Sequence, residues 1–90
     1  MDWPETLKPY RRTREFTQDT VPDGLRQEHN TRAGVWAKIH VLEGCLRYEV
    51  GARSWRLTPE GPPGLIEPEV RHRVAPEGAV RFFVEFYREG

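Results

Sequence analysis

Residues 35–42 read Val35-Trp36-Ala37-Lys38-Ile39-His40-Val41-Leu42. The odd-numbered side chains of this stretch are all apolar, whereas the even-numbered ones are mixed. Successive side chains of a β-strand point to opposite faces, so this period of two predicts a strand with one wholly apolar face. We therefore expect residues 35–42 to form a wall of the hydrophobic core.

Downstream of this stretch, short strand patterns recur between turn signals. Glu43-Gly44 predicts a tight connection into a second strand, residues 45–50, in which apolar and polar side chains again alternate. Gly51 ends that strand, and residues 54–57 are expected to return as its hairpin partner. The proline- and glycine-rich residues 58–64 are excluded from a central strand, because proline lacks the N–H donor that a sheet ladder needs.

The remaining patterns complete an all-β chain. Residues 65–66 and 70–74 are predicted as strands on either side of Pro68, and residues 80–87 as a last strand with aromatic side chains on both faces. About eight short strands with no helix between them imply antiparallel pairing, because parallel strands need long crossovers. The predicted fold is a small double-stranded β-helix, or jelly-roll barrel, with residues 1–90 as one domain.

The composition narrows the classes of function. The chain has 90 residues, 14 basic and 14 acidic side chains, and one cysteine, Cys45. A net charge of zero argues against nucleic-acid and membrane partners, and a single cysteine argues against a disulfide framework. The N-terminus has no signal-peptide pattern, so the protein is expected to be soluble and cytoplasmic.

Five segments of the chain carry a family resemblance. Residues 41–48 (VLEGCLRY) resemble the turn of the first cupin motif, and residues 61–72 resemble the second motif, which ends on a metal-binding histidine. Residues 29–39 (HNTRAGVWAKI), 66–74 (IEPEVRHRV) and 83–87 (FVEFY) are similar to the cupin-like domain that TehB-type tellurite-resistance proteins share with YeaR-like proteins. The resemblance covers about residues 9–87 and implies a small single-domain cupin barrel.

This resemblance implies a binding module that holds a small-molecule or anionic ligand in the barrel, with or without a divalent metal. It also implies a link to tellurite, other oxyanions or stress resistance, and residues 1–90 are expected to lack the methyltransferase domain of some family members. The alternative is a metal-dependent oxygenase or isomerase that uses His29 and His72. The binding module is favoured because Ala37 and Thr31 occupy positions where cupin metal ligands usually lie, and no catalytic residue is assigned.

His29 and His72 are the candidate metal ligands. His72 matches the histidine of the second cupin motif, and His29 lies close to a histidine position of the first. A third ligand is expected from Gln27, Glu85 or water, and the ion in this interpretation is Fe, Zn, Ni or Mn. In the other interpretation, both imidazoles are buried, hydrogen-bonded wall residues of a pocket without a metal. An ordinary histidine pKa near 6.5 does not distinguish the two.

Arginines flank both histidines. Arg32, Arg71 and Arg73, together with Thr31, are the candidate ligand-binding residues, since guanidinium groups bind carboxylates and oxyanions through paired hydrogen bonds. The alternative is chance, because twelve arginines among 90 residues place two or three near any chosen point.

Four side chains are predicted to point away from the core on one face, namely Trp36, His40, Phe83 and Tyr87. A cluster of exposed aromatic side chains marks an interface, whereas single ones need no explanation. We therefore expect a homodimer formed through this face, with His40 as an interface or plain surface residue.

Overall fold

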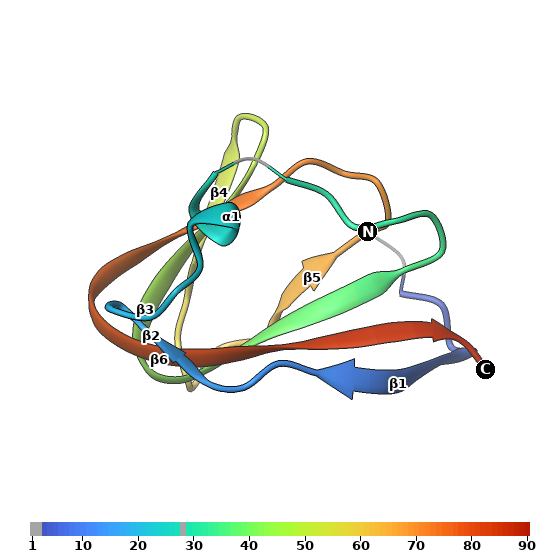
Figure 1. Ribbon diagram of the computed structural model, residues 1–90, viewed down its shortest axis with the longest axis horizontal. Coiled ribbons are helices and arrows are strands. Elements are labelled where there is room, and N and C mark those ends of the chain that lie inside the picture. Colours follow the sequence, from blue (N-terminus) through green and yellow to red (C-terminus); the bar gives the residue numbers. More distant parts are fainter. Residues whose placement is uncertain (1–2, 28) are drawn as a thin grey trace.

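The computed structural model describes residues 3–27 and 29–90. Its strands form one antiparallel six-stranded sheet that folds back on itself (Figure 1). In chain order the elements are β1 (Leu7–Arg12), β2 (Phe16–Thr17), α1 (Asp23–Arg26), β3 (Trp36–Val50), β4 (Arg53–Leu57), β5 (Gly64–Ile66) and β6 (Arg73–Glu89). The all-β prediction is confirmed, since α1 is a single turn. Within the described residues, no helix has the length and apolar character needed to cross a membrane.

The sheet is built around its two long strands, β3 and β6. Residues 36–41 of β3 pair with residues 82–87 of β6 in reverse order. β6 carries β1 and β2 on its other edge, whereas β3 carries β4 and β5, so both long strands are central. Figure 1 shows both strands bending sharply at the same end of the molecule, so that their two halves enclose the interior.

The prediction of a tight turn at Glu43-Gly44 is wrong, because these residues lie inside the continuous strand β3. The register of β3 with β6 instead shifts twice between Val41 and Leu46, which marks β-bulges. Gly44 has a φ of +80°, and a Cβ at this position would lie 2.0 Å from the carbonyl oxygen of Ala79. A bend that only glycine accommodates thus joins two expected strands into one. The expected strands 70–74 and 80–87 are likewise joined in β6, and β1 and β2 were not predicted, so the described sheet has six strands where about eight were expected.

The bulges also change which side chains of β3 face the core. Ala37 and Ile39 are buried before the bulges, and Leu46 and Tyr48 are buried after them. The buried set moves from odd to even positions because an extra residue in a strand reverses its alternation. Of the apolar face predicted for residues 35–42, Ala37, Ile39 and Val41 are buried in the core as expected, and Val35 is half-buried.

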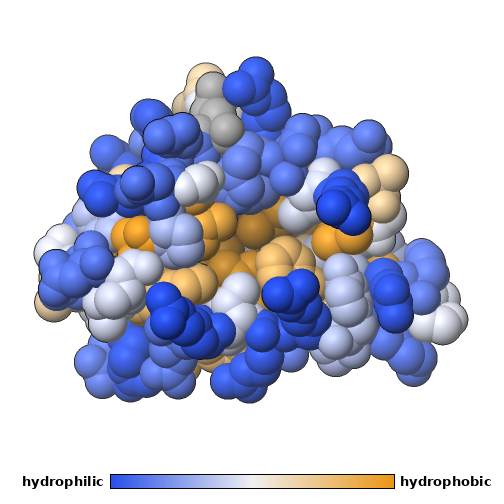
Figure 2. Space-filling view, viewed as in Figure 1, coloured by the Kyte–Doolittle hydropathy of each residue, from blue (hydrophilic) through white to orange (hydrophobic). Residues whose placement is uncertain are grey.

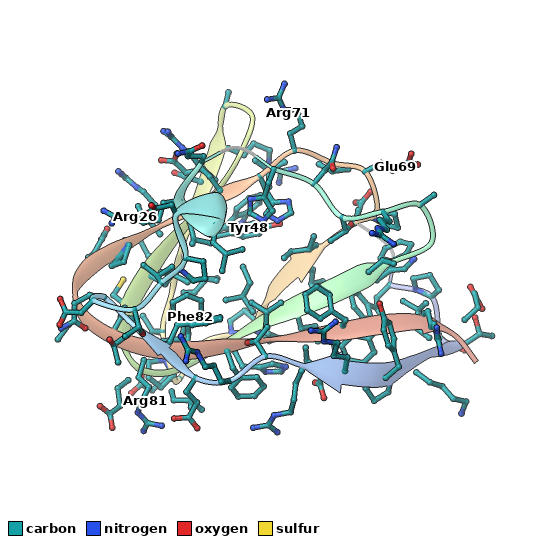
Figure 3. The ribbon with its side chains drawn as sticks, in the orientation of Figure 1. Arg26, Tyr48, Glu69, Arg71, Arg81 and Phe82 are labelled. Atoms are coloured by element: carbon teal, nitrogen blue, oxygen red, sulfur yellow. The ribbon has the colours of Figure 1, made fainter. Side chains whose placement is uncertain are left out.

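The core lies between the two halves of the folded sheet. Its described members are Phe16, Val21, Ala37, Ile39, Val41, Leu46, Tyr48, Leu57, Ile66, Val74, Val80, Phe82 and Val84. Figure 3 shows Phe82 inside this layer, whereas Arg71 and Arg81 point away from the molecule on opposite sides. The interior is thus almost wholly apolar, and His72 is the one charged or polar residue among those fully buried in the described chain.

Candidate ligand pocket

His29 and His72 face each other across an isolated β-bridge. The backbone N–H of His29 donates to the carbonyl oxygen of His72 (2.9 Å), and the N–H of His72 donates to the carbonyl oxygen of His29 (2.8 Å). Residues directly opposite each other in an antiparallel pair carry their side chains on the same face. The two imidazole rings accordingly meet edge to face, with their centroids 4.1 Å apart. The structure brings together the two histidines that the sequence singled out.

In both His29 and His72, a hydrogen bond engages Nδ1 and leaves Nε2 available for a ligand. Nδ1 of His29 lies 3.0 Å from the carbonyl oxygen of Gln27, and Nδ1 of His72 lies 2.9 Å from that of Val70. A carbonyl oxygen only accepts, so Nδ1 carries the proton and Nε2 of a neutral ring keeps its lone pair. Burial lowers the pKa of His72 below its ordinary 6.5, the Val70 carbonyl opposes this shift, and the nearby His29 adds to it. His72 is therefore neutral near pH 7, with Nε2 able to accept a hydrogen bond or bind a metal.

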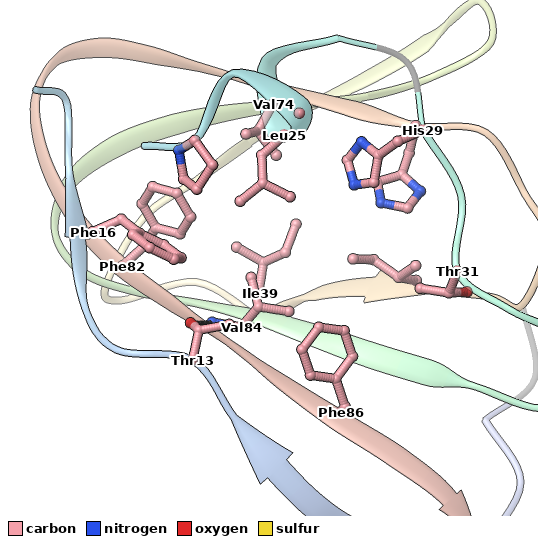
Figure 4. Close-up of a pocket in the computed structure, with 14 residues that line it drawn as sticks. Thr13, Phe16, Leu25, His29, Thr31, Ile39, Val74, Phe82, Val84 and Phe86 are labelled. Atoms are coloured by element: carbon pink, nitrogen blue, oxygen red, sulfur yellow. Dashed lines mark hydrogen bonds between the residues drawn. The ribbon is translucent and has the colours of Figure 1, made fainter. Parts of the chain in front are cut away.

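The two histidines line an apolar pocket inside the barrel. Its volume is about 410 Å³, within the usual range of small-ligand sites. Most of the wall is apolar, with Phe16 from β2, Leu25 from α1 and Val84 from β6 among the lining side chains (Figure 4). Figure 2 shows the same region as a hollow with an apolar floor and a hydrophilic rim. The pocket is suited to a small, largely apolar molecule that makes few polar contacts.

The structure does not bring Glu85, one of the expected third metal ligands, to the histidines. Glu85 lies on the outer face of β6, where it accepts from the Tyr87 hydroxyl (2.6 Å) and lies 3.2 Å from Nε2 of His40. Gln27 is exposed and contacts His29 through its backbone carbonyl. Within residues 3–27 and 29–90, no three His, Cys, Asp or Glu side chains are grouped to hold a metal ion. Common divalent sites use three or four protein ligands, so the described residues fit a metal incompletely.

Tyr48 supports the histidine wall, a role that the sequence did not indicate. Its hydroxyl donates to the carbonyl oxygen of Leu65 (2.7 Å), which ties β3 to β5. Burial, with a smaller effect of the Glu67 charge, raises the pKa of Tyr48 to about 12, so the hydroxyl stays a donor. The Tyr48 ring meets the His72 ring edge to face, with centroids 6.0 Å apart. Strand alternation predicts that Tyr48 is buried, but the contact with His72 depends on the closed barrel.

The four predicted ligand-binding residues separate into two groups. Arg71 and Arg73 flank the inward-facing His72, so alternation directs both outward; both are exposed, and Arg73 forms an ion pair with a glutamate. Thr31 lines the apolar pocket, and Arg32 lines an adjoining hollow that also includes Thr31. Only Thr31 and Arg32 therefore lie where a ligand in the barrel could reach them.

The four predicted interface residues do share the outer face of the sheet. Trp36 lies opposite Tyr87, and His40 lies opposite Phe83, in the β3–β6 register. Trp3 packs edge to face on Trp36 and Tyr87, with centroid distances of 5.6 and 5.1 Å, and His40 stacks on Phe83 at 4.8 Å. The N-terminal segment of the chain thus covers part of this face.

Fold and pocket together define a class of protein, the small cupin barrels. The structure is similar to a cupin-2 domain containing protein from Shewanella frigidimarina, with a TM-score of 0.58 and 14% identity over 93% of this chain and 72% of that one. It is also similar to TehB from Haemophilus influenzae (TM-score 0.88, 27% identity, 94% of this chain and 32% of that one). A protein from E. coli strain K12 matches with a TM-score of 0.88 and 19% identity over 100% of this chain and 98% of that one.

Residues 11–84 match the family model of the TehB-like domain, and the chain belongs to this family. The TehB/YeaR-like resemblance is thereby confirmed. Two curated relatives, both called probable S-adenosyl-L-methionine-dependent methyltransferase TehB and both from Haemophilus influenzae, are 34% and 32% identical over 71 residues, or 72% of this chain. The chain spans only 25% of the length of these relatives, so the match defines a domain family and does not transfer their activity.

Proposed function

We propose that this domain is a ligand-binding module whose barrel pocket takes a small, largely apolar molecule, with the paired histidines as its main polar contact. The observation that supports the proposal is the pocket of about 410 Å³ in which His29 and His72 are paired by backbone bonds. Both rings use Nδ1 to donate to a local carbonyl, so each neutral ring presents Nε2 as an acceptor. A ligand hydroxyl or N–H is the natural partner for such an atom.

The pocket proposal is tested with octan-1-ol, followed by the shifts of backbone amide signals in NMR. Binding should shift signals of pocket residues such as His72 and Val84. A Leu25→Trp substitution fills the pocket from α1 and should weaken binding by at least about tenfold, because the added ring occupies the ligand's place. Leu42→Trp, at a position of β3 that does not line the pocket, is the matched control and should bind as the wild type does. Equal binding by the Leu25→Trp protein would contradict the proposal.

A second candidate function is the metal-dependent enzyme, an oxygenase or isomerase built on His29 and His72. The observation that favours it is the backbone hydrogen bond at each Nδ1, because metal-binding histidines usually donate their other ring nitrogen in this way. A divalent ion would then be bound by the two Nε2 atoms and solvent, and it would supply Lewis-acid or redox chemistry.

Metal analysis of protein purified without a histidine tag separates the two candidates. The enzyme requires about one Fe, Zn, Ni or Mn per chain, lost in His29→Ala and in His72→Ala. Substoichiometric metal in every preparation, unchanged by His29→Ala, would leave only the binding module.

We also propose that the domain acts in the response to tellurite or another oxyanion stress, and that it does so in the cytoplasm. The support is membership of the TehB-like family, since this domain occurs in TehB proteins. A strain lacking the gene should show reduced growth on tellurite, restored by the wild type and not by the Leu25→Trp variant. Restored growth with both the wild type and the Leu25→Trp variant would show that the stress role does not depend on the pocket.

A further inference from the structure

Two arginines at one end of the barrel differ from the four that form ion pairs with glutamates in the described part of the chain. Arg11 of β1 and Arg32 of the loop before β3 line the same hollow, which has a volume of about 380 Å³. Among the described residues, neither guanidinium has an ion pair or a ring contact. Other arginines are held in ion pairs with glutamates, namely Arg47, Arg56, Arg73 and Arg81. Two neighbouring cations without a carboxylate partner create a local positive potential that favours an anion.

The arginine hollow adjoins the apolar pocket. The two share Thr31 and Phe86 as lining residues, so they adjoin at that point. Figure 4 places Thr31 and Phe86 at one end of the apolar pocket and Phe16 at the other. No acidic side chain of the described residues lines either space. The two spaces therefore meet at Thr31 and Phe86, and one of them is apolar whereas the other is lined by two cations.

We propose that Arg11 and Arg32 bind the anionic head, a carboxylate or a similar oxyanion, of an amphipathic ligand whose apolar tail occupies the barrel pocket. The inference rests on the binding-module function and adds the chemical class of its ligand. Guanidinium groups form paired, charge-assisted hydrogen bonds with carboxylates, and the apolar wall excludes water from the tail. The sequence pointed to Arg32 but not to Arg11, because only the closed barrel brings β1 beside the loop before β3.

The test compares octanoate with octan-1-ol, which has the same tail and no charge, by isothermal titration calorimetry. Wild-type protein should bind octanoate at least about tenfold more tightly than octan-1-ol, since charged hydrogen bonds contribute more than neutral ones. The double variant Arg11→Gln with Arg32→Gln should lose this preference while it still binds octan-1-ol. Added salt should weaken octanoate binding and leave octan-1-ol binding unchanged.

The matched control removes two positive charges elsewhere, with Arg47→Gln and Arg53→Gln on the β3–β4 hairpin, and should keep the octanoate preference. Circular dichroism confirms that both double variants are folded. Equal affinity of the wild type for octanoate and octan-1-ol would overturn this inference and leave the binding module intact. So would an equal loss of octanoate binding in the control variant. Binding of neither compound would overturn the binding module itself, and with it this inference.

Discussion

The inner and outer faces of the β3–β6 pair are built from alternate residues of the same two strands. They differ in whether their polar side-chain groups have interaction partners within the chain. On the outer face, the polar and aromatic groups have partners within the chain: Glu85 with Tyr87 and His40, and Trp36 with Trp3. On the inner face, the wall is apolar and encloses a pocket in which Nε2 of His72 has no partner among the described residues.

This difference indicates which face can gain more interactions from a ligand. A group that already has a partner must lose that partner before it can bind something else, so the outer face favours packing over recognition. An apolar pocket with a few acceptor atoms favours any small molecule that fits and donates a hydrogen bond. The proposed binding site is therefore the inside of the barrel, and each prediction below tests how far the two faces differ.

The largest expected effect is on the free energy of unfolding when an inner aromatic is truncated. Phe82 is fully buried, so Phe82→Ala should lower the free energy of unfolding by about 3–5 kcal/mol. The neighbouring Phe83 points outward against His40 and Arg12, and Phe83→Ala should cost about 1 kcal/mol. Urea denaturation of both variants measures the difference. Equal losses would mean that the two faces are packed to the same degree.

The next effect concerns the bulge that changes which residues of β3 face inward. Gly44→Ala should lower the free energy of unfolding by about 3 kcal/mol, because φ is positive and the Cβ would meet the Ala79 carbonyl oxygen. Gly24→Ala is the control: a Cβ there has no neighbour within 4 Å, so the variant should be neutral or gain up to about 1 kcal/mol. A neutral Gly44→Ala would show that the bend does not depend on this residue.

A smaller, pH-dependent effect should come from the inner histidine. Burial lowers the pKa of His72, so the unfolded chain takes up this proton more readily, and stability should fall as the pH drops below about 6.5. For one proton the slope is at most about 1.4 kcal/mol per pH unit. Urea midpoints between pH 7.5 and 5 should show this loss in the wild type and in His40→Gln, which keeps His72, but less of it in His72→Gln. An identical slope in His72→Gln would remove His72 as the cause.

The smallest effect on the free energy of unfolding is expected from a substitution on the outer face. The homodimer predicted to form through this face remains a prediction. Light scattering at micromolar concentration should give twice the chain mass of 10.5 kDa. Phe83→Glu should give a monomer while it changes the free energy of unfolding of the monomer by only about 1 kcal/mol. Trp55→Glu, at an exposed position on β4, should remain a dimer. A monomeric wild type would show that cover by Trp3 is sufficient for this face.

Much of the fold could be predicted from local patterns. Alternation over residues 35–42 correctly predicted the buried Ala37 and Ile39, because the two-residue period of a strand is a property of its own backbone. The turn expected at Glu43-Gly44 was wrong because a glycine before an apolar run fits a hairpin and a bulge equally well. Which one forms depends on β6, whose residue Ala79 lies against Gly44.

The site was predictable in part. The motif resemblance indicated His29 and His72, and the structure pairs them, but it places Glu85 on the opposite face of the sheet. The alternation of β6 could have shown this, because Glu85 lies one residue from the inward-facing Val84. No comparable indication pointed to Arg11, since every residue of its strand after Leu7 is exposed.

The sequence by itself determined that the chain is all-β, that it belongs with the cupin-like TehB family, and that Ala37 and Ile39 face inward. These properties depend on neighbours in the chain and on short motifs. The tertiary structure alone decided that His29 and His72 share a face, that Tyr48 supports them, and that Arg11 and Arg32 line one hollow beside the pocket. Such contacts join residues far apart in sequence, and they form only when the bend at Gly44 lets the sheet close on itself.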